Sequence, residues 1–261
     1  MKIQYLFLFA ASALLVNPVP IISAPAQAAY QSRSAASFAD QVYQRVNPAV
    51  VTVFAGREIG SGSIVNSSGL VITNNHVVRG NSGNVFVRTS TGERISGRVL
   101  ATDSRYDLAL IQLESSGGLP SVRLASNSNL GAGEPVLAIG SPYGRPGVMT
   151  TGTFTASRGN GDLQSRVVLH PGNSGGPLLN SQGEMIGINK AILESARGGN
   201  TGISIATSAE IARRFIEQNM PGALSGGAGG RVAIAPPETI PVRPDVQDNA
   251  PVYQAPQPTY Q

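Results

Sequence analysis

The residues best suited to chemistry in this chain are a serine, two histidines and a small set of aspartates. Ser174 lies in the segment "LHPGNSGGPL", with glycines at positions 172, 175 and 176. These glycines allow a tight turn and leave backbone N–H groups unobstructed by Cβ atoms. The segment is consistent with a nucleophilic serine beside two oxyanion donors, the amides of Gly172 and Ser174, or with an ordinary Asn-Ser-Gly turn.

The choice between these readings depends on a base for Ser174, and the sequence has only two histidines. His76 follows the apolar run "GLVIT" and is expected at the end of a strand. His170 lies four residues before the serine, where it could reach the rim of a site but would align poorly on the hydroxyl with an acid behind it. We therefore predict His76 as the general base, because such a base must be oriented by a third group.

Asp107 is the strongest candidate for that third group. It opens the apolar run "DLALIQL", so the start of a strand would draw its carboxylate toward the interior. A buried carboxylate needs a hydrogen-bonding partner, and a histidine would serve. Asp103, in "ATDSRY", is expected to be a solvated turn residue.

The order of these residues along the chain separates the classes of serine hydrolase. Residues 172–176 fit the G-x-S-x-G pattern of α/β-hydrolases, but that class needs a histidine after the serine, and both histidines precede it. The subtilisin order would require Asp40, which falls on an N-terminal helix. The order His76, Asp107, Ser174 is the chymotrypsin order.

The elements that must position these side chains are mostly short β-strands. From Val50 to about Ala206, short β-rich runs alternate with Gly, Ser and Asn. This pattern predicts an all-β body, with too few helices for a parallel α/β sheet. The runs pause at residues 124–133, so we expect two β-halves, at about residues 46–124 and 132–206.

Two short amphipathic helices are expected to flank the β-rich body. The first follows Ser37, with Phe38, Val42 and Val46 at helical spacing. The second spans residues 208–219 and is opened by a capping box of Thr207 and Glu210. The folded domain is therefore expected to cover residues 37–220.

Both ends of the chain differ from this domain. Residues 1–28 have a charged start, a short apolar run and a small-residue end, which predicts a secretory signal peptide; an uncleaved anchor is the alternative. Residues 221–261 are rich in Gly, Ala, Pro and Gln and are predicted to be a disordered tail. We expect a periplasmic or secreted protein without a stable membrane anchor after cleavage.

Composition argues against several other functions. The sequence has no cysteine, which excludes disulfides, thiolate metal sites and a thiol nucleophile. The net charge is +4, and the arginines are scattered singly except for Arg213-Arg214, so no nucleic-acid partner is expected. No cluster of metal ligands is visible in the sequence, and the expected chemistry needs no metal or organic cofactor.

Four segments resemble, in order and spacing, the protease domain of the HtrA (Deg) branch of trypsin-like serine peptidases: "GSGSIVNSSGLVITNNHVV", "YDLALIQL", "PGNSGGPLLNSQGEMIGINKAIL" and "GGNTGISIA". The resemblance covers roughly Val46 to Ile216. It implies two six-stranded antiparallel β-barrels, with His76 and Asp107 from the first and Ser174 from the second. It also implies that "INKAIL" borders the pocket for the side chain before the scissile bond. Ile192 and Leu193 would make that pocket apolar, and Lys190 there is less expected.

The sequence departs from that family in ways that bear on regulation. Family members usually carry a C-terminal PDZ domain, whereas here only the tail follows the protease domain. Arg166 and His170 stand where the family commonly shows Asp and Asn, in a segment that shapes the oxyanion loop. Family enzymes often assemble as trimers through N-terminal aromatics, for which Phe38 and Tyr43 are the candidates, with core packing as the alternative.

The leading hypothesis is an exported serine endopeptidase that cleaves polypeptides after small or aliphatic side chains. Two alternatives remain open at this point. One is a catalytically weak or inactive binding protein on a protease fold, with the Pro-rich tail as its interaction arm. The other is an esterase that uses the same three residues on small acyl substrates.

Overall fold

The computed structural model describes residues 38–225, with gaps at 81–83, 127–129 and 195–199. These residues belong to one compact unit. The predicted signal peptide, the predicted cap Ser37 and residues 226–261 of the predicted tail lie outside the described residues.

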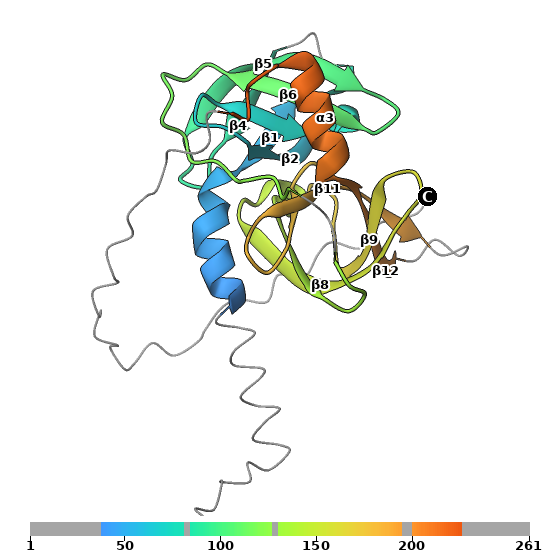
Figure 1. The fold of residues 1–261 in the computed structure, drawn as a ribbon. Coiled ribbons are helices and arrows are strands. Elements are labelled where there is room, and N and C mark those ends of the chain that lie inside the picture. The colour runs from blue at the N-terminus through green and yellow to red at the C-terminus, as the bar shows by residue number, and fades with distance from the viewer. Residues whose placement is uncertain (1–37, 81–83, 127–129, 195–199, 226–261) are drawn as a thin grey trace, which may run out of the picture. The chain divides into compact units, whose positions relative to one another are not determined.

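Six antiparallel strands close into a first barrel, in the order β1-β2-β3-β6-β5-β4 (Figure 1). β1 pairs with both β2 and β4, and this double pairing closes the ring. Branched side chains such as Val51, Val87 and Ile111 fill one of its buried clusters, as expected for strands with β-branched interiors. The strands are β1 (Val50–Ala55), β2 (Glu58–Ile64), β3 (Leu70–Thr73), β4 (Asn84–Arg88), β5 (Arg94–Asp103) and β6 (Leu108–Leu113).

A second closed antiparallel barrel follows in the chain, in the order β10-β11-β12-β9-β8-β7. Between β6 and β7 the described residues form no strand and contribute only an isolated bridge from Leu124 to Met185. The prediction of two six-stranded antiparallel barrels is therefore confirmed. The strands are β7 (Pro135–Gly140), β8 (Val148–Ser157), β9 (Asp162–Val167), β10 (Pro177–Leu179), β11 (Met185–Glu194) and β12 (Asn200–Ser208).

The helices are short. One spans residues 38–46 and continues into the 3₁₀ turn η1 (Asn47–Ala49). Two more lie in connections, α2 (Asn75–Val78) and the 3₁₀ turn η2 (Pro142–Gly144). The last is α3 (Ala209–Asn219).

The predicted cap of the last helix was wrong by one residue. Ser208, not Thr207, caps α3, because its side chain accepts a hydrogen bond from the Ile211 N–H. Thr207 still belongs to β12, and its hydroxyl donates to the Tyr106 carbonyl on the first barrel at 2.8 Å. The strand thus continues further than the capping-box pattern suggested.

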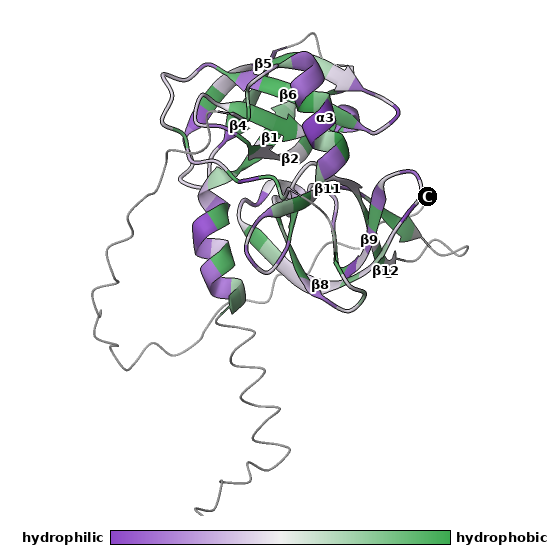
Figure 2. Ribbon diagram, in the orientation of Figure 1, coloured by the Kyte–Doolittle hydropathy of each residue, from purple (hydrophilic) through white to green (hydrophobic). Residues whose placement is uncertain are grey.

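The largest apolar cluster lies between the barrels rather than inside either one. It combines Leu70 and Leu110 of the first barrel, Leu137 and Ile188 of the second, and Phe215 of α3. Figure 2 shows hydrophobic residues along β1 and β6 and hydrophilic residues over much of α3. Burial of this shared cluster holds the two barrels together, because the hydrophobic effect scales with the apolar area removed from water.

Two aromatic side chains of the first helix join the same shared cluster. Phe38 and Tyr43 are partly buried against it, and the Tyr43 hydroxyl donates to the Gly147 carbonyl at 2.8 Å. In this chain both side chains therefore contribute to core packing.

The residues after α3 extend the ordered domain slightly. Ala223 and Leu224 pack against the shared cluster, and the Ala223 carbonyl accepts a hydrogen bond from Asn66. The expectation that disorder begins at residue 221 was therefore wrong for the few residues up to 225, because Ala223 and Leu224 supply apolar side chains that pack against the domain. No helix in the described ranges has the length and apolar character needed to cross a bilayer.

Candidate active site

His76 and Asp107 are in direct contact, although 31 residues separate them. The His76 ring Nδ1 lies 2.7 Å from Asp107 Oδ2, and the backbone N–H of His76 donates to Asp107 Oδ1 at 2.9 Å. A carboxylate can only accept, so Nδ1 carries the proton and Nε2 of a neutral ring is left as an acceptor. This is the arrangement that a general base requires.

His76 does not end a strand, as the sequence suggested. β3 stops at Thr73, and His76 lies in the short helix α2 that follows. The helix is held by the buried side chains of Val77 and Val78, while the His76 side chain keeps a relative exposure of 36%. The strand-to-helix change turns the imidazole toward Asp107.

Asp107 is presented by a tight turn directly before β6. Its backbone has φ +56°, a left-handed conformation that is rare outside glycine, and its carbonyl accepts a hydrogen bond from the Asn74 side chain at 2.8 Å. Asp103 supports the turn, since its Oδ1 accepts the N–H groups of Arg105 and Tyr106. Asp103 is therefore more than the solvated turn residue that was expected.

Ser174 lies on the loop between β9 and β10 of the second barrel and packs against the first. Its carbonyl accepts a hydrogen bond from the Ser61 N–H at 2.7 Å. A Cβ added to Gly60 would meet both a Val77 methyl at 2.6 Å and the Ser174 carbonyl at 3.1 Å. Ser174 is thus brought against the segment that follows β3 and carries His76.

The Ser174 hydroxyl itself makes no hydrogen bond to any residue in the described ranges. Hydrogen bonds of catalytic groups are often long or poorly aligned before substrate binds. The chain therefore places Ser174, His76 and Asp107 in one region, with the acid and base already paired.

The loop around Ser174 combines hydrogen-bonded carbonyls with two N–H groups that have no acceptor in the described part of the chain. All five carbonyls of residues 170–174 accept hydrogen bonds, from the Asn173, Tyr143 and Gly176 N–H groups and from the Ser61 hydroxyl and N–H. In contrast, the N–H groups of Gly172 and Ser174 donate to no acceptor among the described residues. Two unobstructed donors beside a hydroxyl are what an oxyanion site needs.

Glycine is required at position 172. Its φ is +101°, and a Cβ there would lie 2.9 Å from the Tyr143 nitrogen and 3.1 Å from the Pro142 Cα. A larger residue would be strained and would push the loop away from η2. The glycine-rich sequence thus allows the loop to approach η2 closely.

Among the described residues, His170 makes no hydrogen bond or ion pair with Asp107 or His76. Its side chain is exposed, and its ring lies 6.3 Å from that of Tyr143. Arg166, the other departure from the family pattern, is exposed on β9 before that strand ends at Val167. The structure therefore pairs His76, and not His170, with Asp107.

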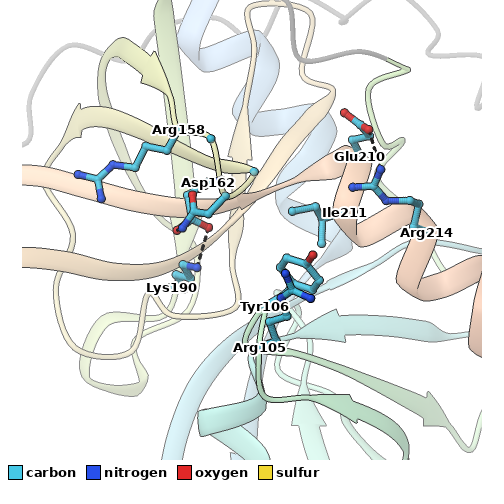
Figure 3. A pocket seen from close by; sticks show the side chains of 11 residues that line it. Arg105, Tyr106, Arg158, Asp162, Lys190, Glu210, Ile211 and Arg214 are labelled. Carbon is cyan, nitrogen blue, oxygen red and sulfur yellow. Dashed lines mark hydrogen bonds and ion pairs between the residues drawn. The ribbon is translucent and has the colours of Figure 1, made fainter.

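Lys190 is neutralised by a partner that local sequence spacing did not reveal. Its Nζ lies 2.7 Å from Asp162 Oδ1 (Figure 3), with side-chain exposures of 17% and 7%. The pairing of β11 with β12 shifts between Asn189 and Ala191, which leaves Lys190 as the extra residue of a bulge. Bulges redirect side chains, and here β12 lies between the strands of the two charges.

The Lys190–Asp162 pair lines a cavity of about 370 Å³ together with Tyr106 and Ile211 (Figure 3). The other two residues predicted for a substrate pocket are less polar. Ile192 packs in part against a cluster of the second barrel, and Leu193 is half-buried.

Comparison with known proteins gives matches over most of this domain. The family model described as "Trypsin-like peptidase domain" matches residues 60–188. A probable periplasmic serine endoprotease DegP-like from Ectopseudomonas mendocina is 41% identical over 169 residues, covering 62% of this chain and 35% of that protein. A probable serine protease do-like from Buchnera aphidicola is 40% identical over 171 residues, with the same two coverages.

A solved structure agrees with the fold. The crystal structure of the serine endoprotease from Yersinia pestis matches with a TM-score of 0.64 and 31% identity, over 70% of this chain and 66% of that one. The chain spans about a third of the length of the curated relatives it matches.

Proposed function

This chain contains a trypsin-like peptidase domain of the HtrA branch, and from this premise we propose that it is a serine endopeptidase with Ser174 as its nucleophile. One observation carries the proposal above the others. The imidazole of His76 is held by Asp107 at 2.7 Å, beside the loop that bears Ser174. An acid–base pair beside a loop that bears a serine supports a role for all three residues in acyl transfer.

The proposed reaction has two halves. In the first, Ser174 Oγ attacks the scissile carbonyl carbon while His76 Nε2 takes its proton, and His76 then gives that proton to the leaving amine as the C–N bond breaks. In the second, water attacks the acyl-enzyme, His76 again takes and returns a proton, and the acid product leaves Ser174 free. Asp107 keeps the neutral ring in the required tautomer and stabilises the imidazolium that forms when His76 holds the proton.

The developing negative charge on the carbonyl oxygen would be met by the N–H groups of Gly172 and Ser174. Both are free of acceptors in the described part of the chain. Preorganised amides of this kind stabilise the tetrahedral intermediate more than the ground state, and so accelerate the chemical step.

For the side chain before the scissile bond we propose a preference for small or aliphatic residues. Ile192 and Leu193 offer apolar surface, whereas the charge of Lys190 is compensated by Asp162. A compensated ammonium offers little to an acidic substrate side chain, which argues against selection of Asp or Glu. Peptide-library cleavage by the purified protein would test this preference.

We further propose that the protein acts on polypeptides outside the cytoplasm. Residues 1–28 read as a signal peptide, and the DegP-like relatives are named as periplasmic endoproteases. A homo-trimer through Phe38 and Tyr43 remains a proposal, and the burial of both side chains against the core leaves only part of each surface for it.

Labelling with a fluorophosphonate probe tests the proposed chemistry. The probe should modify Ser174 of the wild-type protein, and both Ser174→Ala and His76→Ala should abolish labelling and casein cleavage. His170→Ala is the matched control and should retain both activities. A wild-type protein that folds but neither labels nor cleaves would instead favour a binding protein on this fold. Turnover of p-nitrophenyl esters without casein cleavage would favour an esterase.

A further inference from the structure

Ser61 on β2 has no exposed surface, and every polar group it carries is engaged. Its hydroxyl donates to the Gly172 carbonyl at 2.6 Å and accepts from the Ser141 N–H at 2.8 Å. Its N–H donates to the Ser174 carbonyl at 2.7 Å, and its carbonyl accepts from the Thr73 hydroxyl at 2.6 Å. One residue of the first barrel thus holds the main chain of both Gly172 and Ser174.

The contact with Gly172 matters because this residue has no side chain to restrict its backbone. Within the loop, the Asn173 N–H donates to the His170 carbonyl at 3.0 Å and holds one side of the peptide group that follows Gly172. Glycine reaches positive and negative φ about equally, so the direction of its N–H depends on what holds the neighbouring peptide groups. On the preceding side, the Tyr143 N–H holds the Pro171 carbonyl at 2.9 Å. In a trans peptide the Gly172 N–H points opposite to that carbonyl. On the following side, the Ser61 hydroxyl holds the Gly172 carbonyl.

The Ser61 hydroxyl is itself oriented by the chain. Because the Ser141 N–H occupies one of its lone pairs, its proton is directed to the Gly172 carbonyl. The hydroxyl of Ser141 in turn accepts from Thr52 on β1 at 2.7 Å. The side chains of Thr52, Ser61 and Ser141 are all buried, and buried polar networks are rigid when every member is satisfied.

We propose that Ser61 is a positioning residue for the oxyanion site, acting across the boundary between the barrels. Its hydroxyl fixes the peptide group between Gly172 and Asn173, so that the Gly172 and Ser174 amides converge on the substrate carbonyl oxygen. This inference rests on the proposed peptidase function. It implies that the first barrel supplies the geometry of the oxyanion loop as well as the base and the acid.

The chain offers a matched control two residues along the same strand. Ser63 is also fully buried on β2, but its hydroxyl has no hydrogen-bond partner among the described residues. Ser61→Ala and Ser63→Ala therefore remove the same atom from comparable environments. Only the first removes a bond to the loop, so a difference between the two isolates the role of that bond.

Steady-state peptide hydrolysis by the purified protein is the first measurement. Ser61→Ala should lower kcat by about 100-fold, as for loss of an oxyanion donor, and leave KM within about twofold. The affinity for a peptide boronic acid, whose adduct mimics the tetrahedral intermediate, should fall by a similar factor. Thr52→Val, a milder change of the same network, should lower kcat by about fivefold. Ser63→Ala should match the wild type in all of these.

A second measurement does not depend on activity. The ¹H–¹⁵N signal of the Gly172 amide should move in Ser61→Ala and stay in place in Ser63→Ala. Equal kcat values for the two alanine variants, or a rise in KM at unchanged kcat, would overturn the inference, as would an unmoved Gly172 signal. A wild-type protein that fails to label at Ser174 would count against the proposed function alone, and the Gly172 signal would still decide the role of Ser61.

Discussion

At the scale of single residues, Asp107 is held to His76 by both of its carboxylate oxygens. Asp107→Asn leaves one carbonyl oxygen for two N–H donors, and its amide group cannot accept from Nδ1. We expect kcat for peptide hydrolysis to fall by about 10⁴-fold, because the ring is no longer held in the productive tautomer. Circular dichroism should show an unchanged fold.

Asp103→Asn provides the comparison for this change. The backbone N–H groups of Arg105 and Tyr106 both donate to the same oxygen, Asp103 Oδ1. An asparagine keeps an acceptor oxygen at this position. Its kcat should stay within about threefold of the wild type, since no hydrogen bond of the turn is lost. Comparable losses in the two variants would mean that the turn, rather than the carboxylate, controls activity.

The buried pair of Lys190 and Asp162 makes a prediction about stability. Lys190→Met would leave Asp162, with a side-chain exposure of 7%, without its cation. Breaking a buried pair from one side costs about 3 kcal/mol, so urea should unfold this variant at a clearly lower concentration. The double change with Asp162→Asn should recover much of the loss.

An exposed ion pair in α3 is the control for that experiment. Arg214 and Glu210 form an i, i+4 pair with side-chain exposures of 60% and 70%. Arg214→Met should shift the free energy of unfolding by less than about 0.5 kcal/mol, because solvent screens exposed pairs. If both methionine variants lost the same amount, burial of the Lys190 pair would not be the cause.

At the scale of elements, β8 and β9 approach each other at Gly152. An added Cβ would fall well inside contact distance of the Arg166 carbonyl and at 2.9 Å from a Val167 methyl. Gly152→Ala should therefore separate the two strands and destabilise the domain by about 2–3 kcal/mol, measured by thermal unfolding. Because β9 leads into the loop of Ser174, probe labelling should slow as well.

A substitution at Gly159 tests whether the destabilisation by Gly152→Ala comes from the steric overlap between its added Cβ and β9. A Cβ added there meets no described residue within 4 Å, and its φ is not in the left-handed region. Gly159→Ala should leave stability unchanged or raise it by up to about 1 kcal/mol, through the unfolded state. Destabilisation equal to that of Gly152→Ala would remove the steric explanation.

The elements also show what the sequence could and could not predict. The apolar runs that became β3 and β6 were visible, and they pointed to His76, which follows β3 in α2, and to Asp107, which directly precedes β6. β2, with the sequence "EIGSGSI", carries little apolar periodicity, so neither the strand nor the role of Ser61 was predicted. Ser61 is buried where it contacts the loop of the second barrel, and only the folded chain creates that contact.

Pairings across strands were beyond prediction for a similar reason. Lys190 meets Asp162 because β12 lies between their strands and β11 carries a bulge. Neither feature leaves a signal in local spacing. The helix cap at Ser208 was missed because the strand pattern and the capping pattern overlap by one residue.

At the scale of the whole domain, the shared apolar cluster couples the stability of the two barrels. Leu70 and Leu110 of the first barrel and Leu137 of the second are fully buried in one cluster. If one barrel unfolded, the apolar side chains that the other barrel contributes to the cluster would be exposed to water, and that barrel would lose much of the burial that stabilises it. We therefore expect the barrels to unfold as one cooperative unit.

Hydrogen exchange on Leu110→Ala tests this expectation. The substitution removes a buried side chain of β6 and should cost about 3 kcal/mol. If the barrels are coupled, slow amides of β7 in the second barrel should lose as much protection as those of β3 in the first. Leu100→Ala, at a position with 39% exposure on β5, should leave the protection of the amides in both β3 and β7 unchanged. Protection lost only in the first barrel would show that each barrel folds independently. The oxyanion loop would then not require the first barrel for its stability, but only for its geometry.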